Sequence, residues 1–160
     1  MAITQVMTSS FKAQVLLSVH DFRPSAQSGA SIFKVALYTS TASLDADTTA
    51  YTATNEVTGT GYVAGGVALT NLGVTTSSLT SSTGVGWLNF SDATWGSSTI
   101  TARGALIYNS TPKANNNSDA VLTNPSVAVL DFGSDKSSTG GSFTIIFPTP
   151  DYTNAILRIA

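Results

Sequence analysis

The sequence contains no cysteine and only one histidine among its 160 residues. Without cysteine the chain forms neither disulfides nor thiolate zinc sites, and it has no thiol nucleophile. Any metal site would have to be built almost entirely from oxygen ligands. We therefore expect no metal ion and no other cofactor.

Charged side chains are also scarce. The chain has 7 basic and 9 acidic residues, which is 10% of its length, against about a quarter in an average soluble domain. The basic residues are widely separated along the chain, which argues against nucleic acid as a partner. No apolar run approaches the roughly 18 residues of a membrane span, so we expect no membrane partner, and residues 1–10 lack the features of a secretory signal.

Small hydroxyl side chains are abundant, with 22 serines and 24 threonines. Hydrophobic residues still make up 42% of the chain and the net charge is only −2, a balance that favours a folded protein over a disordered one. The length suits one domain, and we find neither a composition boundary nor an internal repeat. The sequence therefore predicts a single domain over residues 1–160.

Apolar spacing predicts one helix near the start of the chain. Phe11, Val15, Leu16 and Val19 follow a helical period, which indicates a short helix over residues 9–19, capped by one of the serines at 9 and 10. From residue 31 onward the dominant period is two, as in β-strands. The strongest candidate strands are residues 32–39, 100–109, 126–132 and 143–147, and weaker candidates are residues 63–69, 85–90 and 155–159.

The predicted strands are short and are separated by turn-rich segments, including residues 133–141, which we expect to be a loop. Residues 73–84 are rich in serine and threonine, which suggests a connection or an exposed edge strand. No long helix follows a strand, so parallel βαβ units are not expected. The predicted fold is all-β, an antiparallel sandwich or jelly roll with one short N-terminal helix.

Few residues suggest catalysis. His20 beside Asp21 is the only imidazole available to activate a hydroxyl, but we favour a structural histidine that interacts with the carbonyls at the helix end. Glu56 is the only glutamate, and most aspartates lie among turn residues, which disfavours the paired carboxylates of a glycosidase. Asp45 and Asp47 alone do not complete a calcium loop. We therefore predict a protein that is not an enzyme, without catalytic, cofactor-binding or metal-binding residues.

Arg103 lies among small residues of a predicted strand, where we expect a structural ion pair. The aromatic residues Trp87, Trp95, Tyr62 and Tyr108 suit either a sugar-stacking platform or, as we favour, the core. Attachment to a partner would rest on apolar and backbone contacts because charges are few. The candidate contact regions are residues 1–8, whose Ile3 and Val6 would otherwise belong to the core, and residues 73–84.

Four stretches of the sequence resemble small virion proteins of tailed bacteriophages, a likeness that extends over most of the chain. They are FKVALYTS (33–40), TATNEVTGTGY (52–62), ITARGALIYN (100–109) and AVLDFGSDK (128–136).

The resemblance implies a structural role in the virion. We expect a capsid decoration (cement) protein that binds the major capsid protein on the outer surface of the capsid, self-associates as a homo-oligomer and assembles in the host cytoplasm. The alternative is a neck, tail or fibre component, such as an adhesin that binds host glycans. An enzyme that hydrolyses cell-surface material is the least favoured interpretation.

Overall fold

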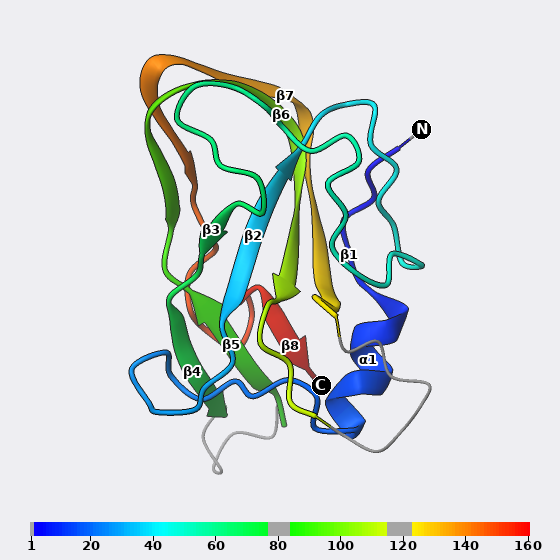
Figure 1. The fold of residues 1–160 in the computed structure, drawn as a ribbon. Helices are drawn as coiled ribbons and strands as arrows, with labels where there is room; N and C mark the ends of the chain where they lie inside the picture. Colours follow the sequence, from blue (N-terminus) through cyan, green and yellow to red (C-terminus); the bar gives the residue numbers. More distant parts are fainter. Residues whose placement is uncertain (1, 77–83, 115–122) are drawn as a thin grey trace.

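The computed structural model describes residues 2–76, 84–114 and 123–160. Its strands form two antiparallel sheets (Figure 1). The larger sheet has the order β1 (Val6–Met7), β7 (Ser126–Ile145), β6 (Ala93–Asn109), β2 (Phe33–Tyr38) and β3 (Val67–Ala68). The smaller sheet has the order β4 (Asn71–Thr76), β5 (Gly86–Phe90) and β8 (Leu157–Ile159). With a single helix, α1 (Ser9–Leu16), in the described residues, the predicted all-β class is confirmed.

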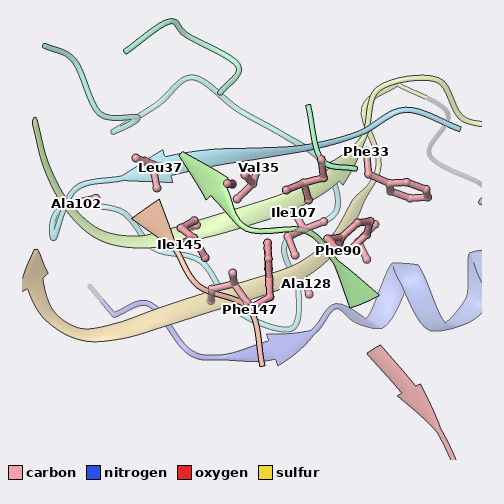
Figure 2. Packing of buried hydrophobic residues seen from close by; sticks show 14 of the residues in the cluster. Phe33, Val35, Leu37, Phe90, Ala102, Ile107, Ala128, Ile145 and Phe147 are labelled. Carbon is pink, nitrogen blue, oxygen red and sulfur yellow. The ribbon is translucent and has the colours of Figure 1, made fainter. Parts of the chain in front are cut away.

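The main core lies between the two sheets (Figure 2). Val35 of β2 and Ile107 of β6 are paired in register and are both fully buried. Phe90 of β5 packs against them from the smaller sheet, and its ring lies 5.7 Å from that of Phe33. The sandwich-like arrangement follows from strands that each present a continuous apolar face to the other sheet.

A second buried cluster covers the opposite face of the larger sheet. Tyr38 of β2, Leu106 of β6 and Val129 of β7 point to this face and pack with Ile3 and Leu44 from the segments that cross it. The central strands are therefore buried on both faces. The candidate strands at residues 32–39 and 126–132 both contribute to this doubly covered part of the sheet.

The helix is shorter than predicted and its buried face differs. Helix α1 ends at Leu16, and Ser18 follows with φ 56°, a left-handed conformation that stops the helix. Leu16, expected in the apolar stripe, is 87% exposed, whereas Gln14 is buried. The N-cap is Thr8, and its hydroxyl bonds Ser126 of β7 at 2.8 Å instead of capping the helix. Tertiary contacts thus override the helical pattern here.

Strands β6 and β7 form one long, curved antiparallel ribbon, paired from Tyr108↔Ser126 to Ala93↔Ile145. The predicted strand at residues 100–109 lies inside β6. The strands predicted at 126–132 and 143–147 belong almost entirely to the single strand β7, so the loop predicted at 133–141 is wrong. Gly133 and Gly140 have φ of 74° and 64°, so the glycines produce bends and register shifts within the strand rather than ending it.

The weaker strand predictions have mixed outcomes. Residues 85–90 correspond to β5, and residues 155–159 end in the three-residue β8. Only Val67–Ala68 of the predicted strand 63–69 is a strand. The predicted edge segment 73–84 begins within β4, and its part at 77–83 lies outside the described residues.

Candidate functional site

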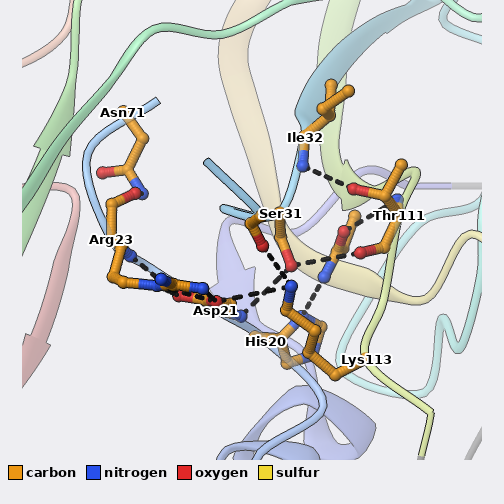
Figure 3. A network of polar contacts seen from close by, with 10 residues as sticks. His20, Asp21, Arg23, Ser31, Ile32, Asn71, Thr111 and Lys113 are labelled. Carbon is orange, nitrogen blue, oxygen red and sulfur yellow. Dashed lines mark hydrogen bonds and ion pairs between the residues drawn. The ribbon is translucent and has the colours of Figure 1, made fainter. Parts of the chain in front are cut away.

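The segment that follows α1 helps to line a cleft with three charged side chains, which we call the polar cleft. Figure 3 shows the polar contacts of its residues. The cleft encloses about 580 Å³. Its walls include Asp21 and Arg23 from this segment, Lys113 from the segment after β6, and Val74 from β4. The three segments that supply these residues are far apart in sequence and are brought together by the packing of the two sheets.

His20 is buried beneath this cleft. Its Nε2 lies 2.9 Å from Oε1 of Gln14, and its Nδ1 lies 3.1 Å from Nδ2 of Asn109. Because Oδ1 of Asn109 accepts the Thr111 backbone N–H, the amide of Asn109 is oriented to donate to Nδ1. The neutral Nε2–H tautomer satisfies both contacts, and burial lowers the pKa of His20 to about 4.

The contacts of His20 differ from the predicted ones. The side-chain amides of Gln14 and Asn109, rather than helix-end carbonyls, hold the ring, and the ring of Phe11 lies 5.1 Å away. A Ser–His pair requires a hydroxyl within hydrogen-bonding distance of the imidazole. In the described residues, the contacts of both ring nitrogens are instead with amides.

Asp21 connects two cations at the mouth of the cleft. Nε of Arg23 donates to Oδ1 at 3.0 Å and Nη2 of Arg23 donates to Oδ2 at 2.5 Å, and Nζ of Lys113 lies 3.4 Å from Oδ2. The Arg23 guanidinium holds the pKa of Asp21 well below its usual range. Lys113 also donates to the backbone carbonyl of Gly29. The group therefore carries two positive charges against one negative charge.

A second polar cluster, on the other side of β2, surrounds the only glutamate. Oε1 of Glu56 accepts from the Tyr62 hydroxyl at 2.6 Å and from the Gly65 N–H at 2.7 Å, and Oε2 accepts from the Tyr51 hydroxyl at 2.7 Å. Burial and the adjacent carboxylate raise the pKa of both tyrosines, and burial raises that of Tyr108 to about 12. The carboxylate holds the loop between β2 and β3 against the sheet.

The sequence analysis noted Glu56 but missed this cluster. A lone acidic residue with tyrosines five and six positions away was the available signal, although the loop conformation that joins them could not be read from spacing. The bonded partners of the Glu56 carboxylate are two phenols and a backbone amide.

Asp45 and Asp47 form a turn in which Oδ1 of Asp45 accepts the backbone N–H of Asp47 at 2.9 Å. Across the part of the chain that the structure describes, no three acidic or histidine side chains are grouped to hold a metal ion. Arg103 forms the predicted ion pair, with its Nε 3.2 Å from Oδ1 of Asp131.

The four aromatic residues do not assemble into one platform. Trp95 and Tyr108 are buried, Tyr62 stacks on Trp95 at 6.0 Å, and Trp87 lies on the smaller sheet. Trp95, Tyr108 and Tyr62 belong to or pack against the core clusters, as we favoured, whereas Trp87 does not.

The N-terminal segment is part of the fold. Ile3 is buried against Gly104, and Val6 and Met7 pair with Val129 and Ala128 at the edge of the larger sheet. The attachment-arm interpretation of residues 1–8 is therefore wrong for Ile3, and the core interpretation holds.

Part of the outer edge of β7 has no partner strand among the described residues. Strand β1 pairs only with residues 128 and 129 of β7, so among the described strands none pairs with the outer edge of β7 beyond them. We call residues 131–146 the β7 edge. Beside it lies a hollow of about 460 Å³ lined by Phe132 and Phe143, and Ile146 is 78% exposed. The sequence analysis missed this surface because it assigned residues 133–141 to a loop.

No family model, curated protein or solved structure matches the chain. No helix in the described residues is long and apolar enough to cross a membrane. The resemblance to phage virion proteins therefore rests on the residues of the sequence alone.

Proposed function

We propose that this chain is a structural protein of a tailed-bacteriophage virion, namely a capsid decoration protein that binds the major capsid protein at the outer surface and associates with further copies of itself. The observation that carries the proposal is the β7 edge, which offers free backbone groups beside an aromatic hollow. Such an edge can accept a strand from a neighbouring protein, and contacts of this kind do not require a strongly charged surface.

The composition of the β7 edge favours a selective contact over non-specific association. Lys136 and Asp135 place charges on it, and serine, threonine and glycine supply most of the other positions. Edge strands in soluble proteins commonly carry charges and bends that prevent random pairing. A partner must therefore match both the curvature of the ribbon and its apolar hollow.

The proposal is tested by cryo-electron microscopy of particles of the virus that encodes the protein. We expect many copies over the outer capsid surface, with the β7 edge against the major capsid protein. A few copies at the neck, tail or fibre would instead support the alternative role, and absence from purified particles would refute both.

A matched pair of variants tests the surface itself. Ile146→Asp places a charge at the hollow and should abolish binding to particles that lack the protein. Val63→Asp changes a side chain of similar exposure, 75%, on the loop before β3 and should bind as the unmodified protein does. Equal binding by both variants would show that the β7 edge is not the contact.

A further inference from the structure

A second hollow adjoins the polar cleft. This apolar groove of about 240 Å³ lies between α1 and the smaller sheet. Phe22 and Val74 line both the apolar groove and the polar cleft, so the two hollows adjoin at these side chains. The apolar groove is lined only by apolar residues and glycine, among them Phe22, Val74 and Gly86.

The polar cleft has an excess of positive charge next to this groove. Asp21 neutralises one of the two cations, Arg23 and Lys113, and both cations remain accessible, with side-chain exposures of 51% and 39%. A ligand whose tail fills the groove would therefore place its polar end within reach of these cations. A negative charge at the polar end of the ligand would be favoured.

We propose that the apolar groove and the polar cleft together form a binding site for an amphiphilic monoanion, a medium-chain fatty acid in chemical class. The unbranched alkyl tail occupies the groove, and the carboxylate lies beside Arg23 and Lys113. Binding is non-covalent and does not depend on the virion role proposed above.

The lining favours an alkyl tail over an extended peptide. A peptide backbone in the groove would lose its hydrogen bonds to water and find no polar side chain to replace them. The neighbouring part of the β4 edge is also occupied, because the Ser25 N–H bonds the Asn71 carbonyl at 3.2 Å and the Asn71 N–H bonds Ser25 Oγ at 2.8 Å. An alkyl chain carries no backbone groups that need such partners.

The first test measures binding of hexanoate, octanoate and decanoate by calorimetry, below the concentrations at which they form micelles. Each methylene that enters the groove should tighten binding about fourfold, until the groove is full. Decanol should bind about two- to fivefold more weakly than decanoate, because the contribution of exposed cations is modest. Absence of saturable binding, or affinity independent of chain length, would overturn the proposal.

Gly86 allows a sharp test of the groove. A side chain at Gly86 meets no atom within 4 Å of its Cβ, and the same holds for Gly96 on β6. Gly86→Leu should fill the groove and lower decanoate affinity at least tenfold, whereas Gly96→Leu adds the same side chain elsewhere and should leave affinity unchanged. If Gly86→Leu fails to fold, Val74→Glu provides the test, because the Val74 side chain is 61% exposed. This variant should weaken the binding of decanoate more than the binding of decanol.

Arg23→Gln tests the position of the carboxylate, with Lys136→Gln on β7 as the matched loss of one positive charge. We expect Arg23→Gln to remove most of the preference for decanoate over decanol and Lys136→Gln to preserve it. Equal effects would show that only overall charge matters, which contradicts the site. If the protein without ligand is a dimer that Gly86→Leu dissociates, the groove holds a second copy, and the proposal is wrong.

Discussion

The hydroxyl of Tyr62 donates to Oε1 of Glu56 at 2.6 Å while its oxygen accepts the backbone N–H of Leu37 at 2.9 Å. One phenol therefore connects the central strand β2 to a buried carboxylate. The arrangement holds the loop between β2 and β3 over the sheet without any cation within ion-pair distance of Glu56 among the described residues.

Two substitutions of Glu56 should distinguish the contribution of its charge to stability from the contribution of its hydrogen bonds. In Glu56→Gln the remaining oxygen still accepts from Tyr62 and Gly65, and the Tyr51 hydroxyl turns to accept from the new amide, so we expect a loss of about 1 kcal/mol in the free energy of unfolding. Glu56→Ala removes the acceptor of one buried and two partly buried donors and should lose about 3 kcal/mol or more. Urea denaturation measures both, with Asp47→Ala as an exposed control expected within about 0.5 kcal/mol of the unmodified protein.

Acid should destabilise the protein through His20. Its pKa is lowered by burial from 6.5 to about 4, so the unfolded chain binds a proton more readily than the folded one between these values. Stability should be complete above pH 6.5, fall by up to about 3 kcal/mol as the pH decreases to 4, and lose nothing further from this group below pH 4.

Unfolding free energies at a series of pH values test this slope. His20→Gln should be less stable at pH 7 but should lack the dependence between pH 6.5 and 4. Asp21→Asn serves as the control, because the lowered pKa of Asp21 affects stability only at more acidic pH. An unchanged slope in His20→Gln would show that another group is responsible.

Gly66 should tolerate no side chain. Its φ is 67°, and a Cβ there would overlap the carbonyl of Val35. Gly133 has a similar φ of 74° but no atom within 4 Å of a built Cβ. We expect Gly133→Ala to lose about 1 kcal/mol from conformational strain alone, and Gly66→Ala to lose at least about 3 kcal/mol, because the backbone must also move. Thermal unfolding of the two variants compares the cost of backbone strain alone with the cost of strain plus atomic overlap. Equal losses of stability would contradict the close approach of Gly66 to the Val35 carbonyl.

The N-terminal segment should be required for folding. Ile3→Ala removes a buried side chain and should lose about 2–4 kcal/mol, and deletion of residues 1–8 should leave the chain largely unfolded, as judged by circular dichroism. Val63→Ala, at an exposed position, should be nearly neutral. A truncated protein that folds normally would show that the burial of Ile3 is not required for folding.

The fold class could be predicted because the alternation of apolar and polar residues along a strand can be recognised from a short stretch of sequence. Phe33, Val35 and Leu37 mark β2 without reference to any partner strand, and the apolar run at 126–132 indicates a central strand in the same way. Residues 133–141 could not be assigned, because turn-forming residues also occur in a curved two-stranded ribbon. There the pairing with β6 decides the conformation, not the propensity of the residues themselves.

The candidate site was less accessible to sequence reasoning. His20 and Asp21 were identified as a pair, but their distant partners, Asn109 at the end of β6 and Lys113 after it, are reached only through the packing of the sheets. The burial of Ile3 and the exposure of Leu16 also depend on what covers each position, which no local period encodes.

The bond between Thr8 and Ser126 joins residues 118 positions apart. During synthesis, β1 therefore emerges from the ribosome long before the strand that it pairs with exists. Contacts of such long range slow folding, whereas the β6–β7 ribbon can form from a nearly contiguous stretch of chain. We expect this ribbon to form first and the N-terminal segment to dock last, so that folding is completed only after most of the chain has been released.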